Sequence, residues 1–508
     1  MKNRIFFSIM LISLLAAVLF SCSDEFLNVR PIDAITSDNF YQNESQMNRA
    51  LNAAYSPIGN RGMFGWWLGL IRNVRGDNTE TVEANVIAHN NFTVNDTDIR
   101  LFNRNNGDGL WNSIFVGILR CNLIIVNMPE TNIPEMPVKN RILGQALFLR
   151  ALYNFYLVDY WNQGPLILED NYNLTDIPLS NREEIYQAIE NDLKKVIDGN
   201  MLPWDYNGSP GFERGRASMG SVHALLGKAF LFQDKFTEAQ VQFQTVINSG
   251  VYDLLPLDDV WTIRGDNGPE SVFEVQFNNA NAGPNAFFDD GVNAAEITLR
   301  NQTIAPNQYN GWENAFPSQS LVNEFEQGDL RRAHSIVIPG ELFPNQSEPF
   351  LGLARNRGAF AIKKGMNSGF SSGTPSGTGE ENFPIIRYAD VLLMAAEAIV
   401  RGGGDQNLAL DYIDRVRVRA FGLESIQELR SAGLGIQQYA SGKGISLFEA
   451  IKHERRVELC FEGHRYSDLT RWGDLSTNAI LIDRGWAPDK TYYPLSREDI
   501  DLSSLFGN

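Results

Sequence analysis

LGKAFLFQDKFTEAQVQF, residues 226–243 of this 508-residue chain, is the stretch that indicates the fold. Its apolar residues recur at helical spacing on both sides of Gln233-Asp234-Lys235, a polar tripeptide that predicts a turn. The stretch also matches the L-G-x2-Y and A-x3-F spacing of helix-turn-helix repeats of the tetratricopeptide type. A pair of packed helices is therefore expected here. The matching residues are Leu226, Gly227, Phe230, Ala239 and Phe243.

Two further helix pairs follow the same plan. Residues 387–401 are joined through Gly402-Gly403-Gly404 to a helix that begins near Asp405, whose side chain is suited to N-capping. A third pair combines residues 138–160 with residues 182–197. Stacked helix pairs bury a continuous core and commonly bind partners, which favours binding over catalysis. The predicted fold class is mostly α, with a tetratricopeptide-like scaffold of helix pairs.

Helical periodicity covers residues 42–58, 110–250 and 387–473. The chain between the last two regions is rich in Asn, Gly and Pro, with short strand-like runs such as residues 271–277. This composition predicts an irregular, loop-rich α+β cap on the helical scaffold. The predicted organisation is a lipoprotein signal peptide at 1–21, an N-terminal tether at 22–40, a helical repeat scaffold with N-terminal loops at 41–260, the cap at 261–385, and a C-terminal helical scaffold with a terminal segment at 386–508.

Composition limits the partners. The formal charge is -18 and the pI is near 4.8, so phosphates would be repelled and no nucleic acid partner is expected. Cys121 and Cys460 lie in apolar helical patterns, where a small core-filling role is expected, and no Cys or His spacing predicts zinc. We expect no metal and no cofactor.

The N-terminus has the pattern of a targeting segment. Lys2 and Arg4 precede an apolar run at 5–20 that is too short to span a membrane stably. Cys22 follows Ser21 directly after this run and resembles the acylated cysteine of a bacterial lipobox, although Phe20 departs from the strictest pattern. Lipid chains on Cys22 would anchor a chain that has no other apolar run of spanning length. The alternative is an ordinary signal peptide followed by a chance cysteine.

Most catalytic motifs fail on context. Gly369-Phe370-Ser371-Ser372-Gly373 matches a nucleophile elbow but lies in a Gly/Ser-rich loop rather than between a strand and a helix. His453-Glu454 begins like a zinc-protease helix, but Val457 stands where the second histidine is required. With 61 acidic residues, pairs of carboxylates carry no information about glycoside hydrolysis.

The charged stretch ERRVELCFEGHRYSDLTRWGD, residues 454–474, has two interpretations. On a helix, Glu454, Glu458 and Glu462 would repel one another unless cations interleave. Val457, Cys460 and Phe461 add an apolar stripe, so some of the charges must lie near the core, where only paired ions are tolerated. We favour a structural ion-pair network over a catalytic cluster. The cations expected to interleave are Arg455, Arg456, Arg465 and Arg471.

This stretch, with Phe448-Glu449-Ala450-Ile451 before it, resembles the C-terminal signature of the SusD/RagB family of Bacteroidetes outer-membrane lipoproteins. Four other segments agree with the resemblance along the predicted mature chain. They are Cys22 with Asp24-Glu25-Phe26-Leu27 and Pro31; Arg387-Tyr388-Ala389-Asp390-Val391-Leu392-Leu393-Met394 with Ala396-Glu397-Ala398; Arg415, Arg417, Arg419 and Ala420; and Tyr493-Pro494-Leu495 with Glu498-Asp499-Ile500.

The resemblance implies a binding protein rather than an enzyme. Family members act at the cell surface as ligand-binding lids on a SusC-like TonB-dependent outer-membrane transporter. Most bind glycans and some bind peptides, so a glycan is the expected ligand and a peptide the alternative. A surface glycoside hydrolase is the alternative from a different class.

The candidate ligand residues come from side-chain chemistry, because aromatic faces pack against sugar C–H surfaces and polar groups pair with hydroxyls. Trp66-Trp67 is flanked by Gly62, Gly65 and Gly69, which favours a loop, although apolar neighbours permit a core interpretation. Trp261 lies between an apolar run and a strand and is expected in the core. The predicted ligand residues are Trp66, Trp67, Asp77, Asn78, Tyr309 and Trp312, the last two in a segment that resembles one near the ligand surface of relatives.

Overall fold

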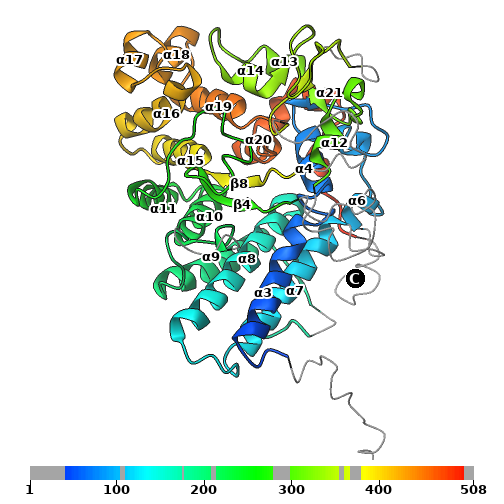
Figure 1. Cartoon of the computed structure of the whole chain (residues 1–508), viewed down its shortest axis with the longest axis vertical. Coiled ribbons are helices and arrows are strands. Elements are labelled where there is room, and N and C mark those ends of the chain that lie inside the picture. The colour runs from blue at the N-terminus through cyan, green and yellow to red at the C-terminus, as the bar shows by residue number, and fades with distance from the viewer. Residues whose placement is uncertain are drawn as a thin grey trace, which may run out of the picture.

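The computed structural model describes residues 40–102, 109–173, 177–206, 213–278, 298–353, 360–366 and 379–496. The predictions for the signal peptide at 1–21, for Cys22 and for the loop around Ser371 lie outside these residues. The described chain forms a stack of helices with an irregular cap above it (Figure 1).

A continuous row of long helices makes the scaffold. Each helix packs against the next: α3 on α7, α7 on α8, α8 on α9, α9 on α10, α10 on α11, α11 on α15 and α15 on α16. All three predicted helix pairs are confirmed, and the contact between α11 and α15 joins the scaffold across the inserted cap. The bounds are α3 Glu44–Gly59, α7 Leu110–Asn127, α8 Met136–Trp161, α9 Arg182–Asp198, α10 Met219–Leu231, α11 Phe236–Asn248, α15 Tyr388–Arg401 and α16 Gln406–Ala420.

Local sequence explains why these helices begin and pack where they do. Asp405 caps α16 as predicted, its side chain accepting from the Asn407 N–H. Asp234 takes the left-handed backbone (φ 57°) that turns the chain between α10 and α11. A Cβ at Gly227 would lie 2.6 Å from the Phe243 ring, so the repeat pattern requires glycine for close helix packing.

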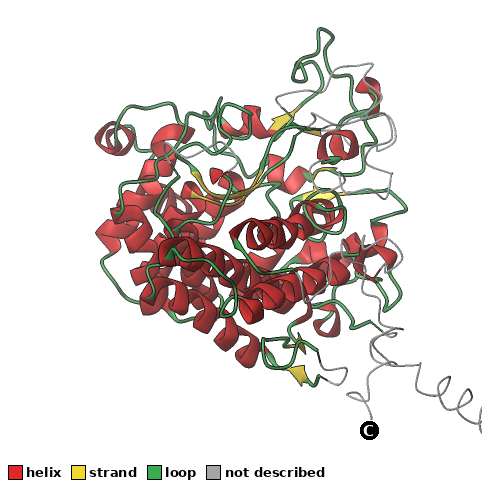
Figure 2. Ribbon diagram, turned by 60° about the horizontal axis from the view of Figure 1, so that its bottom comes forward, coloured by secondary structure: helices red, strands yellow, loops and turns green. Residues whose placement is uncertain are grey.

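The C-terminal part adds shorter helices beyond α16, and the cap and loops add others (Figure 2). The former are α17 Ile426–Ser431, α18 Ile436–Lys443, α19 Leu447–Glu458, α20 Arg465–Trp472 and α21 Ala479–Asp483. The latter are α4 Trp67–Val74, α5 Ile87–Asn90, α6 Ile99–Phe102, α12 Arg300–Ile304, α13 Gln319–Val322 and α14 Arg331–Ser335, with 3-10 turns at Asn307–Tyr309, Asp474–Thr477 and Pro488–Lys490.

Four two-stranded antiparallel sheets occur in the described residues. The strand predicted at 271–277 is confirmed as β4, and its partner β8 runs directly into α15, so this sheet brings the two ends of the cap together on the scaffold. The pairs are β1 Thr79–Glu80 with β5 Phe316–Pro317, β2 Gly164–Pro165 with β3 Leu179–Ser180, β4 Ser271–Val275 with β8 Phe383–Arg387, and β6 Ile336–Val337 with β7 Ala361–Ile362.

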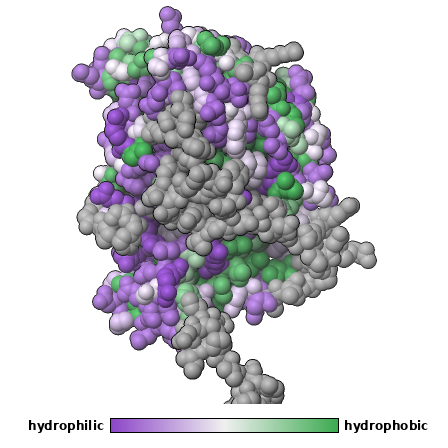
Figure 3. Space-filling model, turned by 45° about the vertical axis from the view of Figure 1, so that its right-hand side comes forward, coloured by the Kyte–Doolittle hydropathy of each residue, from purple (hydrophilic) through white to green (hydrophobic). Residues whose placement is uncertain are grey.

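One large hydrophobic core runs through the scaffold, and a smaller one fills part of the cap. Cys121 and Cys460 are fully buried in the large core and Trp261 is buried there too, as predicted. The molecular face in Figure 3 is mostly hydrophilic, with hydrophobic residues gathered in its lower half.

Helix α7 contradicts one expectation from the sequence. Among the described residues it is the one helix with the length and composition to cross a membrane, although no second apolar run of spanning length was expected. It packs against α3 and α8, and 56% of it is buried. These contacts identify α7 as a core helix of the scaffold.

Candidate ligand-binding site

The short helix expected to carry Glu454, Glu458 and Glu462 ends before the last of them. Helix α19 ends at Glu458, and Phe461 adopts a left-handed backbone (φ 65°), so Glu462 lies beyond the helix end. The predicted helical array is therefore wrong at Glu462, and Cys460 and Phe461 do not continue a stripe on α19. A second helix, α20, begins at Arg465.

The glutamates of this stretch are neutralised by cations from other segments, and Glu458 is the clearest case. Arg387 and Arg419 donate to its Oε1 at 2.7 and 2.6 Å, and Arg331 donates to Oε2 at 3.0 Å. Burial raises the pKa of Glu458, but these guanidinium groups outweigh it and hold the pKa well below its usual range. The other two pairings are Glu454 with Arg331 and Arg417, and Glu462 with Arg387 and Lys364.

The arginines of the stretch were expected to pair with Glu454, Glu458 and Glu462, but they pair with other carboxylates. Arg455 donates to Asp390 at 2.8 Å and to Asp468 at 3.0 Å, and Arg471 pairs with Glu397 and Asp468. Buried charges are tolerated when they are paired and hydrogen-bonded. The predicted ion-pair network is confirmed, but apart from Arg471 with Asp468 on α20 its pairs join different elements, namely α15, α16, α19, α20, β8 and the cap.

Asp77 and Asn78 belong to the same network. Both are 3% exposed. Arg465 donates to both carboxylate oxygens of Asp77 at 2.7 and 3.0 Å, and Arg456 Nε donates to Asn78 Oδ1 at 2.8 Å. The guanidinium groups keep the pKa of Asp77 below its usual range although burial raises it. These side chains are committed to the interior, and the structure gives no support to their predicted contact with ligand.

Three predicted ligand residues come together at the boundary between scaffold and cap. The Trp66 and Trp67 rings stack with centroids 3.9 Å apart at 15°, and the Trp312 ring lies 5.8 Å from Trp66 at 49°. All three are half-buried. We name these three residues the tryptophan platform. Half-exposed rings in contact with one another offer the apolar faces against which sugar rings pack.

The N-terminal half of the platform is placed by a tight turn. Trp66 is the N-cap of α4 and Trp67 is its first residue. A Cβ at Gly65 would lie 2.5 Å from the Gly59 carbonyl oxygen, so this turn requires glycine. The loop that the glycines predicted is present up to Trp66, but Trp67 and Gly69 lie inside α4.

The cap supplies the other half. The Trp312 N–H donates to the Gln302 carbonyl at 2.8 Å, which folds the segment after the Asn307–Tyr309 turn back onto α12. The Leu299 N–H donates to the Gly65 carbonyl at 3.0 Å, which ties the cap to the turn before Trp66. Two segments far apart in the sequence therefore form one surface.

A cation lies beside the platform. The Arg100 guanidinium lies 5.8 Å from the Trp67 ring centroid. It is oriented by Asn85 Oδ1 at 3.0 Å and by Asp98 Oδ2 at 3.4 Å. Arg100 and Asn85 could not be identified from the sequence, because no local pattern indicates which of 43 Lys and Arg side chains reaches a given aromatic ring.

Tyr309 lies apart from the exposed surface. It is 4% exposed in the small core of the cap, its ring stacks on Phe343 at 5.2 Å, and its hydroxyl donates to the Glu348 carbonyl at 3.0 Å. Burial raises the pKa of its phenol. Tyr309 packs the segment that leads to Trp312 and is not placed to contact a ligand directly.

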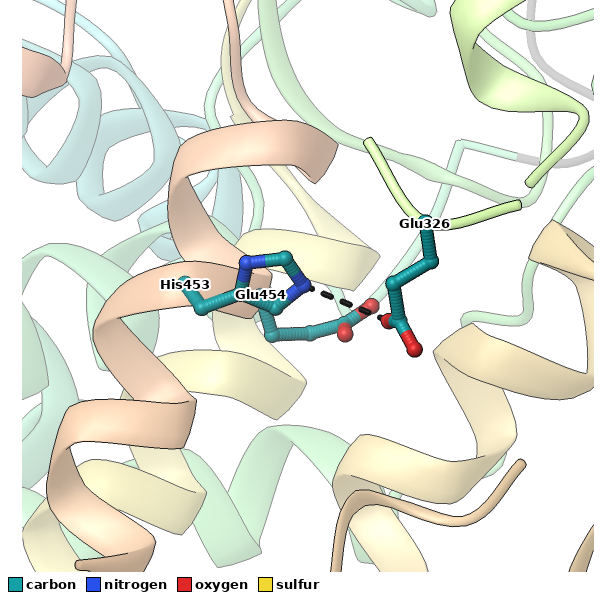
Figure 4. Close-up of side chains that lie close together, drawn as sticks. All are labelled: Glu326, His453 and Glu454. Carbon is teal, nitrogen blue, oxygen red and sulfur yellow. Dashed lines mark hydrogen bonds and ion pairs between the residues drawn. The ribbon is translucent and has the colours of Figure 1, made fainter. Parts of the chain in front are cut away.

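One cluster has the residue types of a metal site. Atoms of Glu326, His453 and Glu454 lie within 4.8 Å of one another (Figure 4). However, both Glu454 oxygens accept from guanidinium groups, those of Arg331 and Arg417, each at 2.6 Å. These cations would repel a metal ion at this carboxylate, so the geometry favours an ion-pair cluster.

His453 is the cationic member of that cluster. Its Nδ1 lies 2.6 Å from Glu324 Oε1 and its Nε2 lies 3.3 Å from Glu326 Oε1. Burial lowers the pKa of His453, but the two carboxylates outweigh burial and raise it above 6.5. With a hydrogen bond at each nitrogen, the imidazolium links α19 to the cap segment after α13.

Comparison with known families gives two matches along the chain. Residues 25–228 match a family described as "Starch-binding associating with outer membrane", and residues 340–494 match the SusD family. "SusD-like protein P2" from Formosa agariphila is 27% identical over 487 residues, which cover 92% of this chain and 90% of the relative. "Starch-binding protein SusD" from Bacteroides thetaiotaomicron is 22% identical over 422 residues, 70% of each chain.

Solved structures share the fold. A "Laminarin binding SusD-like protein" superposes with a TM-score of 0.73 at 26% identity, covering 91% of this chain and 98% of that one. "Surface glycan-binding protein A" from Bacteroides thetaiotaomicron, solved with laminarihexaose, has a TM-score of 0.73 at 21% identity, with the same coverage. The predicted tetratricopeptide-like architecture with its cap is confirmed by this likeness.

Proposed function

The chain belongs to the SusD/RagB family, and from this premise we propose that it is a cell-surface lipoprotein that captures glycans. The relatives support a carbohydrate ligand, because their names specify starch and laminarin. The ligand surface that we assign is the tryptophan platform of Trp66, Trp67 and Trp312. The single observation that carries this assignment is the contact of three half-buried indole rings from two distant segments.

We further propose that captured glycan passes to a SusC-like TonB-dependent transporter, for which this protein serves as the lid. The family resemblance supports this role, and the description of one matching family places its members at the outer membrane. Lipid attachment at Cys22 would hold the protein beside such a partner.

The proposed role requires binding without catalysis. In the network at 454–474 the ionisable side chains are buried and paired, so their charges stabilise the fold. The SusD-like relatives are described as binding proteins, which agrees with this interpretation.

Affinity electrophoresis in gels that contain laminarin or starch tests the ligand and the site together. A ring stacked on a sugar contributes on the order of 1 to 3 kcal/mol, by analogy with stacking on bases, or a roughly five- to 150-fold change in Kd. We expect Trp66→Ala and Trp312→Ala to lose most retardation while their melting temperatures stay near that of the wild type.

The matched control is Trp486→Ala, which removes a half-buried tryptophan that packs near Leu481 in a separate cluster. This variant should be retarded like the wild type. Unchanged retardation of both platform variants would refute the site, and wild-type protein that no glycan retards would refute the proposed ligand class.

A further inference from the structure

A second cavity lies on the scaffold, away from the tryptophan platform. It has a volume of about 270 Å³ and is bounded by the segment after α9, the start of α10 and the region around β4. None of its lining residues belongs to the tryptophan platform. This is the volume that about nine molecules of liquid water occupy. It lies just below the range of small-ligand pockets, roughly 300 to 1,000 Å³. It is large enough for a small ligand.

An aromatic side chain held in a fixed orientation lines this cavity. The Trp204 ring stacks on His223 with centroids 5.5 Å apart at 8°, and Gln242 Oε1 holds His223 Nδ1 at 2.7 Å. Trp204 lines the cavity and is half-buried, whereas His223 does not line it. Burial lowers the pKa of His223, which favours the neutral imidazole as a support for the indole. This stack braces Trp204 from outside the cavity.

The remaining wall is polar and carries both donors and acceptors. Asp205 and Arg214 are exposed at the cavity, and among the described residues no hydrogen bond or ion pair holds the Arg214 guanidinium. The carboxylate of Glu274 is fixed by the Asn267 N–H and by Asn382 Nδ2, both at 2.6 Å. An apolar ligand could not accept a hydrogen bond from the Arg214 guanidinium, and an anion would meet the carboxylates of Asp205 and Glu274.

We propose that this cavity is a second saccharide site, which takes one or two sugar units at the end of a chain. A sugar ring offers an apolar face to Trp204 and hydroxyls that both donate and accept toward Arg214 and Asp205. The saccharide class rests on the proposed function, but the site uses none of the residues of the tryptophan platform. Its small volume separates it from a surface that grips a polysaccharide along its length.

The test uses the chain from which only the proposed signal peptide has been removed. This protein is titrated with maltose or with laminaribiose, and binding is measured by saturation-transfer NMR. We expect millimolar binding of at least one disaccharide. Trp204→Ala should weaken it at least fivefold. Arg214→Ala should weaken it roughly two- to tenfold, as expected for one lost hydrogen bond. Arg214 is exposed and holds no described partner, so this variant should fold even if Trp204→Ala does not.

The control is Trp486→Ala, which lies outside both proposed sites and should bind both disaccharides as the wild type does. If the wild type gives no signal with either disaccharide, or if both cavity variants bind like the wild type, the second site is refuted. Weakened disaccharide binding in Arg214→Ala together with wild-type retardation by polysaccharide supports two separate sites. A failure of the platform assignment would leave the disaccharide result unaffected.

Discussion

Glu458 is the position at which the ion-pair network should be most sensitive to mutation. Its carboxylate accepts from Arg331, Arg387 and Arg419, and it is 3% exposed. Glu458→Ala removes one acceptor from three guanidinium groups at once. It leaves a cavity lined by these cations, which we expect water to fill. Glu458→Gln keeps the volume but removes the charge, and it turns an amide donor toward a guanidinium donor.

The magnitude follows from the partners that remain. Arg331 keeps Asp329 and Glu454, and Arg387 keeps Glu270 and Glu462, so neither cation becomes fully unpaired. Breaking a buried pair typically costs about 3 to 5 kcal/mol of unfolding free energy. Because that range applies when a charge is left unpaired and here each cation keeps a carboxylate, we expect the lower end, about 3 kcal/mol, for Glu458→Ala. For Glu458→Gln we expect about 1 to 3 kcal/mol, the range for a hydrogen bond that loses its charge assistance.

Urea unfolding followed by circular dichroism measures this loss as a lower midpoint. The matched control is Glu449→Ala on the same helix, whose exposed carboxylate pairs with Lys452 at 3.0 Å and should contribute no more than about 1 kcal/mol. Folded Glu458→Ala protein should be retarded normally in glycan gels. A wild-type midpoint for Glu458→Ala would refute the structural role, and a wild-type midpoint together with lost glycan binding would show that the cluster is a binding site.

Two other predictions concern the cluster at His453 and the lipid anchor. The folded state binds a proton at His453 that the unfolded state releases near pH 6.5, so wild-type stability should fall as pH rises through the raised pKa. His453→Gln should remove this slope in urea midpoints measured from pH 6 to 9, and an identical slope in both proteins would contradict the assignment. Labelling cells with alkyne palmitate should mark the wild type but not Cys22→Ala, and label that persists on the variant would exclude acylation at this cysteine.

Helix pairing could be predicted from the sequence because its causes are local. The pattern at α10 and α11 sets turn, cap and helix packing within one short stretch, and Gly227 against Phe243 shows the contact that the pattern requires. The partners within the ion-pair network could not be predicted, because they lie far apart in the sequence. Arg331 and Glu458 are 127 residues apart, and no periodicity relates them.

In the candidate site too, features with local causes could be predicted from the sequence and contacts between distant segments could not. Glycines near Trp66 indicated a loop, and the structure has a tight turn before Trp66, but helix α4 begins already at Trp67. The approach of Trp312 to Trp66 depends on how the cap folds back, which only the hydrogen bonds around α12 reveal. Asp77 was a reasonable polar candidate by proximity in sequence, but Arg465 reaches it from 388 residues away and commits it to the interior.

The network at 454–474 also explains how two distant segments hold one binding surface. Helix α4 begins at Trp67 and is followed by Asp77, which Arg465 anchors to α20. The cap strand β5 follows Trp312, and it pairs with β1 directly after Asp77. Both halves of the tryptophan platform are therefore joined to the same base.

This connection assigns different tasks to the two parts of the chain. Buried, mutually paired charges give the base a single arrangement, since any shift would leave an ion unpaired at a cost of several kcal/mol. The indole rings, in contrast, lie at the ends of short loops, where side chains can change without disturbing the core. The stretch at 454–474 that resembles the family signature is thus the support, and under the proposed function the choice of glycan would depend on the rings that this support positions.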